Sequence, residues 1–282
     1  ATLVSYTGFA VMLFAGVAYW PNVISRIGLR FPLYPFFVAS TFYFLLRGLR
    51  TRNRNNFLLS GIFLGLGLHG YTPFRIVPLL AIMTVILWWA HTRTQVDRYT
   101  GKNILLNFAA LIGSALVVFL PLLRYALAYP NEFWNRAASR ALVENPLPVF
   151  FSNLWNALLM FNINDGNIFV NSIVHRPALD VVTGALFLIG LTLLLARRNF
   201  SDLFLLAAIL TLILPSVVSL AYPDENPALN RAAGALVPVF VVVGLTLDGL
   251  LTGLSVGSSR SGQKLVSAGV VCILFVASAA QN

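Results

Sequence analysis

Arginine supplies nearly all the positive charge of this chain, and its placement suggests a site for anions. Only Lys102 and Lys264 are lysines, so 17 of the 19 basic residues are arginines, against nine acidic residues. Eleven basic residues cluster in four short segments, and the other eight lie between these segments. A guanidinium is planar, stays charged and donates bidentately to phosphate. The eight scattered arginines are Arg26, Arg30, Arg75, Arg124, Arg136, Arg140, Arg176 and Arg231.

Phosphate binding is the chemistry that these arginines predict, with salt bridges to nearby acids and lipid-headgroup contacts as the alternative. Arg75 and Arg231 each lie beside the start of an apolar segment, where a cation must reach outward or face a polar cavity. Arg26 and Arg30 flank the start of another apolar segment and complete the predicted phosphate-binding set. For Arg136 and Arg140, which lie in an amphipathic segment, contact with a lipid surface is expected instead.

The other polar residues near these arginines are candidates for binding a substrate. Asp224 and Glu225 form a carboxylate pair that suits a sugar hydroxyl or a cation, although capping of the next helix is an alternative. Asp165 lies in an Asn-Asp-Gly turn. No spacing of His, Cys, Asp or Glu is typical of a metal site, so no metal is expected, and the use of a divalent cation is left open. The candidate substrate-binding residues are His69, Tyr71, Asp165, Arg176, Asp224 and Glu225.

The composition indicates an integral membrane protein that crosses the bilayer many times. Hydrophobic residues make up 58% of the 282 residues, charged residues only 10%, and the mean hydropathy is +0.82. These values exclude an ordinary soluble domain, a disordered chain and a disulfide scaffold. Because charged residues are so few, the net charge of +10 indicates membrane topology and anion sites, and no nucleic-acid partner is expected.

Nine apolar runs predict an all-α fold with about nine transmembrane helices in one domain, residues 1–282. A single helix over 57–90 would be about 50 Å long, well beyond a bilayer core of about 30 Å. Two helices joined by a turn at Tyr71-Thr72-Pro73 are therefore expected. The runs are 2–20, 31–49, 57–71, 73–90, 103–126, 178–196, 201–221, 233–254 and 266–281.

The four basic clusters predict the orientation of these helices. They alternate correctly with the other connections if all four face the cytoplasm. The outer connections are then 20–31, 71–75, 127–177 and 222–232. The long outer loop, 127–177, is expected to hold two helices in the membrane interface, 131–143 and 148–161, followed by a polar loop. The clusters are Arg47 to Arg54, Arg93 to Lys102, Arg197-Arg198, and Arg260 with Lys264.

Several of these segments resemble one family of membrane glycosyltransferases. The glycine-rich stretch 61–70 followed by Tyr71-Thr72-Pro73-Phe74-Arg75 is similar to the protein-mannosyltransferase-like enzymes (glycosyltransferase family 39-like), which include the bacterial aminoarabinose transferases and have the GT-C fold. Residues 20–30, 164–180 and 230–238 fit the same family. The glycines of 61–70 also have a simpler explanation, which is close packing of helices.

The resemblance implies transfer of a sugar from a polyprenyl-phosphate donor to a lipid, glycan or protein acceptor at the extracytoplasmic face of the cytoplasmic membrane. Such enzymes use an acid in their first outer loop as general base. Residues 1–30 contain no equivalent acid, so the catalytic residue is expected upstream of Ala1, in an N-terminal part that this chain lacks. Its catalytic residues therefore stay unknown.

Two other classes of protein remain open from the sequence. A non-catalytic subunit of a larger membrane complex, derived from the same fold, would have partners in that complex and would tolerate changes in its polar residues. A lipid or solute transporter would favour charges near the middle of the membrane and broken helices. The charges of this chain lie mainly at the ends of the apolar runs, which favours the glycosyltransferase.

Overall fold

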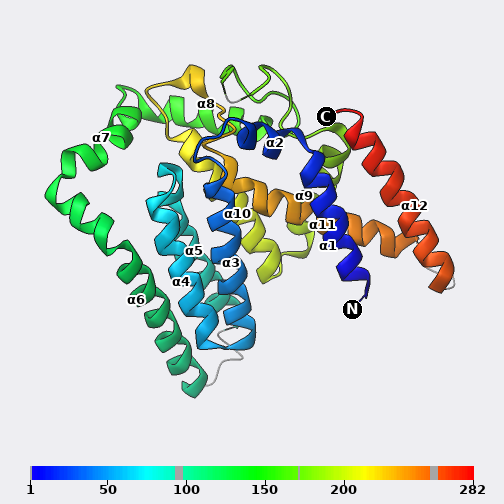
Figure 1. Cartoon of the computed structure of the whole chain (residues 1–282), viewed down its shortest axis with the longest axis horizontal. Helices are drawn as coiled ribbons and strands as arrows, with labels where there is room; N and C mark the ends of the chain where they lie inside the picture. Colours follow the sequence, from blue (N-terminus) through cyan, green and yellow to red (C-terminus); the bar gives the residue numbers. More distant parts are fainter. Residues whose placement is uncertain (1, 93–97, 171, 255–259) are drawn as a thin grey trace.

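The computed structural model describes residues 2–92, 98–170, 172–254 and 260–282, and every regular element in these ranges is a helix (Figure 1). The all-α prediction is therefore confirmed for the described residues. The elements are α1 (Thr2–Val17), α2 (Tyr19–Arg26), α3 (Leu33–Thr51), α4 (Arg54–His69), η1 (Thr72–Ile76), α5 (Val77–Thr92), α6 (Arg98–Ala128), α7 (Pro130–Ala141), α8 (Pro146–Leu159), α9 (Val181–Arg197), α10 (Phe200–Val217), η2 (Pro223–Glu225), η3 (Ala233–Ala235), α11 (Leu236–Leu254) and α12 (Arg260–Ala279).

Each of the nine apolar runs contains a helix, and the expected break near Pro73 is present. Helix α4 ends at His69, and the 3-10 helix η1 holds Pro73 in its first turn before α5 begins. The two helices expected in the long outer loop are α7 and α8, each within two residues of its predicted bounds. Local capping explains several boundaries: the Asp180 carboxylate accepts hydrogen bonds from the first amides of α9.

Four of the described helices are long and apolar enough to cross a membrane, or five if α1 and α2 form one bent span. The four spans are Thr72–Thr92, Leu105–Ala128, Phe200–Val217 and Ala233–Leu254, and the bend between α1 and α2 is 57°. Helix α4, with 16 residues, is only about 24 Å long. The structure thus supports several membrane-spanning helices, whereas the count of nine stays a prediction.

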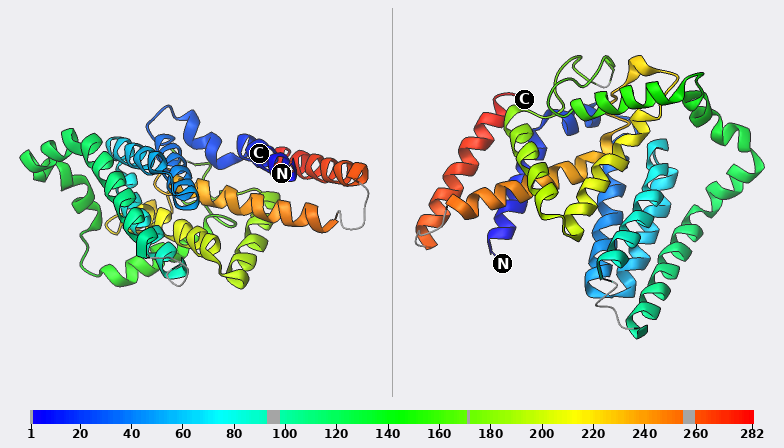
Figure 2. Two further views of the ribbon diagram at one scale, coloured as in Figure 1. Left: turned by 90° about the horizontal axis from the view of Figure 1, so that it is seen from below. Right: turned by 180° about the vertical axis from the view of Figure 1, so that it is seen from behind.

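The helices form two groups with α10 between them. Helix α4 packs against both α3 and α6, while α11 packs against α9 and α1, and α12 joins this second group. Helix α10 contacts α5, α8, α9 and η3. Figure 2 shows the same arrangement from below and from behind, with α7 and α8 lying across one end of the molecule. This end also carries α2 and the segment 222–232 (Figure 1).

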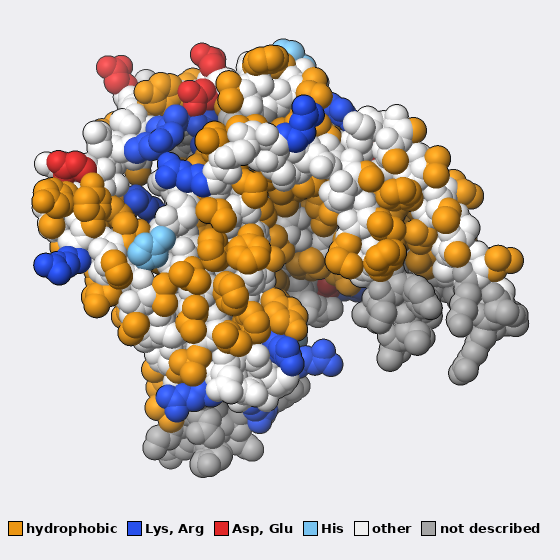
Figure 3. Space-filling view, in the orientation of Figure 1, with side chains coloured by type: hydrophobic (Ala, Val, Ile, Leu, Met, Phe, Trp, Pro, Cys, Tyr) orange, Lys and Arg blue, Asp and Glu red, His pale blue; other side chains and the backbone are white. Residues whose placement is uncertain are grey.

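The polar side chains are distributed as a membrane protein requires. On the face drawn in Figure 3, Lys and Arg side chains gather at two opposite ends, Asp and Glu lie mostly at one of them, and hydrophobic side chains cover the region between. The cluster from Arg47 to Arg54 lies at the turn between α3 and α4, opposite the end covered by α7 and α8. Arg93 lies outside the described residues, as do the side chains of Arg98, Lys102, Arg260 and Lys264.

The glycines of α4 allow the close contact with α6. A methyl group on Gly61 would collide with the Leu111 carbonyl, and one on Gly65 would lie 2.7 Å from Cβ of Val118. At the same crossing, the Ser114 hydroxyl donates a 3.1 Å hydrogen bond to the carbonyl of Leu58. The simpler explanation of the glycine-rich stretch, close helix packing, is therefore confirmed at these two positions.

Replacing Gly61 with alanine is expected to destabilise the protein by roughly 1–3 kcal/mol, because the new methyl group must push α6 away from α4. The measurement is thermal unfolding of the purified protein in detergent. Gly113→Ala on α6 is the control, since a methyl group there meets no atom within 4 Å. Equal stability of the two variants would contradict the packing argument.

Candidate functional site

A cavity of about 610 Å³ lies at the end of the molecule that carries α7 and α8. Its lining includes residues from all four of the predicted outer connections, so these connections meet in space. We call it the arginine cavity, because its charged lining residues are Arg75, Arg136, Arg140, Arg231 and Glu225.

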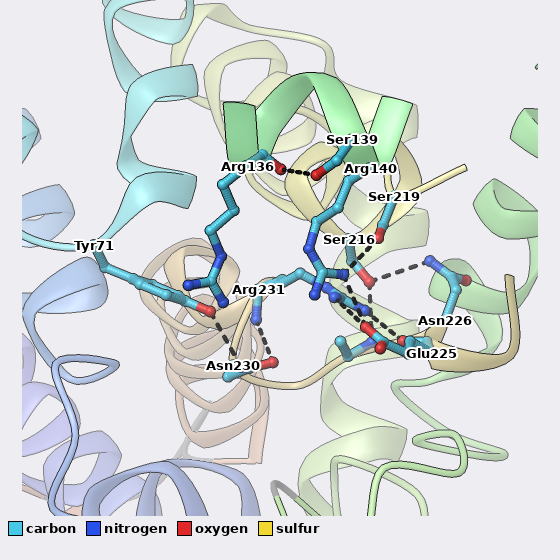
Figure 4. Close-up of polar contacts among 11 residues, drawn as sticks. Tyr71, Arg136, Ser139, Arg140, Ser216, Ser219, Glu225, Asn226, Asn230 and Arg231 are labelled. Atoms are coloured by element: carbon cyan, nitrogen blue, oxygen red, sulfur yellow. Dashed lines mark hydrogen bonds and ion pairs between the residues drawn. The ribbon is translucent and has the colours of Figure 1, made fainter. Parts of the chain in front are cut away.

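One carboxylate bridges two of these arginines (Figure 4). Oε2 of Glu225 accepts hydrogen bonds of 2.8 Å from Nη1 of Arg140 and 2.8 Å from Nη1 of Arg231. Arg231 is buried, and its Nη2 also donates to the backbone carbonyl of Glu225 at 2.6 Å. Arg140 comes from α7 and also donates to the Ser219 hydroxyl. This bridge therefore ties α7 to the segment that precedes η3.

The pKa of Glu225 reflects the same contacts. Partial burial of the carboxyl acts to raise its pKa, but the hydrogen bonds and charges of Arg140 and Arg231 outweigh that effect and lower the pKa below its ordinary value. Glu225 is therefore ionised at neutral pH. A carboxylate with a lowered pKa is a weak general base.

Arg75 joins η1 to α7 through an aromatic contact. Its guanidinium lies 3.8 Å from the centre of the Phe133 ring, and Nη1 donates a 3.2 Å hydrogen bond to the carbonyl of Phe133. The Trp134 ring lies 5.4 Å away. Stacking on aromatic faces stabilises a guanidinium without neutralising its charge. Arg75 thus lines the cavity, which is one of the two alternatives that the sequence left open at this position. No described carboxylate forms an ion pair with it.

Arg136 is an exposed cation in the lining of the arginine cavity. It lies four residues before Arg140, so the two side chains leave the same face of α7. Figure 4 shows Arg136 reaching toward Tyr71. The guanidinium makes no hydrogen bond or ion pair with any residue that the structure describes, and its exposed surface opens to the cavity.

Tyr71 and Asn230 form the polar floor beside Arg136. Nδ2 of Asn230 donates a 3.1 Å hydrogen bond to the Tyr71 hydroxyl, and both residues are buried. Burial raises the pKa of Tyr71, while the charges of Arg231, Arg136, Arg30 and Arg140 act to lower it. Arg30 lies 5.9 Å from the centre of the same ring. The phenol thus stays protonated and lies in a positive field.

The arrangement can bind an anion that carries an apolar group. Four guanidinium groups face one carboxylate in this cavity, which leaves three positive charges among the described lining residues. Most of the remaining wall is apolar: Leu29, Phe31, Pro73, Ile76, Trp134, Ala137, Ala141, Ile168, Val170, Leu214, Pro215 and Val218. No group of three or more His, Cys, Asp or Glu among the described residues could hold a metal ion.

Six candidate residues from the sequence do not line the arginine cavity: Arg26, Arg30, His69, Asp165, Arg176 and Asp224. Arg26 is exposed at the end of α2, and Asp224 is exposed beside Glu225, so the expected carboxylate pair is split. His69 donates from Nε2 to the carbonyl of Val118 at 2.9 Å, which places it in the contact between α4 and α6. By contrast, the predicted phosphate-binding residues Arg75 and Arg231 line this cavity together with Tyr71 and Glu225.

Asp165 and Arg176 form a separate cluster around Tyr19. The Tyr19 hydroxyl donates a 2.7 Å hydrogen bond to Oδ2 of Asp165 and accepts one from the amide of Ile173. The Arg176 guanidinium lies 4.4 Å from the centre of the Tyr19 ring and donates to the carbonyl of Gln281. These contacts join α2, the loop that follows α8 and the segment after α12. These contacts give Asp165 and Arg176 a structural role in holding this loop.

Arg136 and Arg140 are the site residues that sequence reasoning missed. They were expected to contact lipid headgroups, whereas the structure places both in the lining of the arginine cavity. Their spacing of four residues was a signal that both lie on one face of a helix. Which side that face turns to depends on how α7 crosses the ends of the other helices, and the sequence does not encode that crossing locally.

Comparison of the chain with protein-family models, with curated proteins and with solved structures finds no match. The similarity to GT-C glycosyltransferases therefore rests on the sequence motifs described above.

The buried carboxyl of Asp165 is expected to weaken the fold as the pH rises. Burial raises its pKa above the ordinary value of 3.8, although the hydrogen bond from Tyr19 and the charge of His175 oppose this, and Oδ1 has no described partner. The folded state then holds the proton to higher pH than the unfolded state does, so this contribution to stability falls from about pH 4 upward. Asp165→Asn removes the titration.

The measurement is the difference in unfolding temperature between Asp165→Asn and the unmodified protein, taken from pH 4 to pH 7. The difference should change steadily in favour of the variant as the pH rises. A difference that does not vary with pH would show that Asp165 titrates alike in the folded and unfolded states.

Proposed function

We propose that the arginine cavity binds the phosphate of a membrane-lipid phosphate. We further propose that the protein belongs to an enzyme that transfers a sugar from a polyprenyl-phosphate donor to an acceptor at the extracytoplasmic face of the cytoplasmic membrane. The observation that carries the proposal is the excess of guanidinium groups, four against one carboxylate, in a single cavity with a largely apolar wall. A phosphate supplies the missing negative charge in a geometry that arginine matches.

The position of the cavity supports a lipid-linked ligand over a free solute. Arg75 belongs to a helical segment apolar enough to span a membrane, and Arg231 precedes another. The cavity therefore lies where apolar segments meet the connections that the sequence predicts to be outer, which is where the headgroup of a membrane lipid would lie. Its apolar lining, which includes Leu214 and Val218, suits an isoprenoid chain. The proposal also includes a GT-C fold, of which this chain forms a part with about nine transmembrane helices.

The proposed chemistry assigns these residues to the leaving group. When the bond between the sugar's anomeric carbon and the phosphate oxygen breaks, the electron pair stays with the phosphate, whose negative charge grows. Guanidinium groups fixed around that oxygen stabilise the growing charge. The acceptor must lose a proton to a general base, and Glu225, which is bridged between two arginines, is unsuited to that role.

Arg136→Ala is expected to weaken binding of polyprenyl phosphate about tenfold or more, because a charge-assisted hydrogen bond contributes roughly 1.5–3 kcal/mol. The variant should fold normally, since the exposed Arg136 side chain has no described hydrogen-bond or ion-pair partner to lose, and its backbone carbonyl still accepts from Ser139. Binding is measured on the purified protein in lipid nanodiscs. Arg124→Ala on α6 is the matched control, because Arg124 lies in the same outer region but does not line the cavity.

The alcohol of the same isoprenoid chain tests whether the phosphate is the group recognised. It should bind weakly to all three proteins. Equal affinity of Arg136→Ala and Arg124→Ala for polyprenyl phosphate would refute the proposed site. Tight binding of the alcohol would refute phosphate recognition, whereas phosphate binding without sugar transfer by the protein would favour a non-catalytic subunit.

A further inference from the structure

Glu225 is the only carboxylate in the lining of the arginine cavity among the described residues. The charged and titratable groups that line the cavity with it are Tyr71, Arg75, Arg136, Arg140 and Arg231. If the cavity served only to attract anions, a negative charge inside it would be a disadvantage. Its presence therefore needs an explanation beyond anion binding.

Pairing of Arg140 and Arg231 explains part of the role of Glu225. The buried Arg231 guanidinium is 10% exposed and would be costly without a partner, whereas the Glu225 side chain is 39% exposed. One bridge satisfies Arg140 and Arg231 but leaves Arg75 and Arg136 without a carboxylate. The cavity is thus divided into a part already occupied by Glu225 and a part open to a ligand.

A ligand in the open part lies in the same cavity as the Glu225 carboxylate. A phosphodiester carries one negative charge, while a phosphate monoester carries about 1.5 to 2 negative charges at pH 7. Each additional charge on the ligand meets the same repulsion from Glu225. Because charges interact strongly in a partly buried site, that repulsion weakens binding of the doubly charged ligand more than binding of the singly charged one.

We infer that Glu225 is a charge-selecting residue, which lets the arginine cavity hold a singly charged phosphodiester and weakens its hold on a doubly charged phosphate monoester. This inference rests on the proposed function. In the proposed reaction the sugar donor is a phosphodiester and the released lipid phosphate is a monoester. Glu225 therefore lowers the affinity for the product more than the affinity for the donor, which speeds product release.

The experiment compares two amphiphiles with the same tail, dodecyl phosphate and methyl dodecyl phosphate, binding to the purified protein in nanodiscs. At about pH 8 the first is a dianion and the second a monoanion, whereas at about pH 5 both carry one charge. Glu225 stays ionised at the lower pH because its two arginines lower its pKa. The measured quantity is the ratio of the two dissociation constants.

Glu225→Gln should shift this ratio about tenfold in favour of dodecyl phosphate at pH 8 and leave it nearly unchanged at pH 5. The amide oxygen still accepts hydrogen bonds from Arg140 and Arg231. Asp224→Asn is the matched control, since Asp224 is the adjacent acid and lies outside the lining, so its ratio should equal that of the unmodified protein. Glu225→Asp, which keeps the charge, should retain most of the original preference.

Three results would overturn the inference. An equal gain in affinity for both amphiphiles would mean that Glu225 merely competes for the arginines. A shift in the ratio at pH 5 as large as at pH 8 would mean that ligand charge is not what Glu225 senses. If neither amphiphile binds the unmodified protein, the proposed function fails and the inference fails with it. Should Glu225→Gln not fold, Glu225→Ser, which lets water solvate the two arginines, serves for the same comparison.

Discussion

The need to satisfy arginine charges within an apolar helical protein shapes one end of this molecule. Arg231 is buried beside the start of α11, and a buried charge is tolerated only with a close partner. That partner, Glu225, also binds Arg140, so a single carboxylate fixes the segment before η3 against α7. Arg75 ties η1 to the same helix through Phe133. Helix α7, which has no buried residues of its own, is held in part by these arginine contacts.

The helices beneath supply a rigid frame for these contacts. Helix α6, which packs closely on α4 at Gly61 and Gly65, leads directly into α7. On the other side, Nε1 of the buried Trp20 donates to the carbonyl of Leu229, which holds the segment containing Glu225 and Arg231 against α2. The geometry of the arginine cavity therefore depends on both of these contacts.

The sequence predicted most of the fold because its strongest signals are local. Hydropathy placed a helix in each apolar run, and Pro73 marked the break before α5. Length limits the count of membrane spans, since α4 and α9 have only 16 and 17 residues. The site was predicted less completely, because Arg75 and Arg231 stand out in apolar sequence whereas Arg136 and Arg140 lie in a polar helix. Only the position of α7 across the ends of the other helices places Arg136 and Arg140 in the cavity lining. Arg26, at the end of α2, lies outside that lining.

A network of structural salt bridges would account for only part of this cavity. Such a network explains the bridge in which Glu225 pairs with both Arg140 and Arg231. It does not explain why Arg75 and Arg136 point into the same space with no described carboxylate to neutralise them. Like charges that gather without counter-charges raise the free energy of the fold, unless an anion binds there. The bridge then holds the walls of the cavity together, and the two arginines without a carboxylate supply the positive charge that binds the ligand.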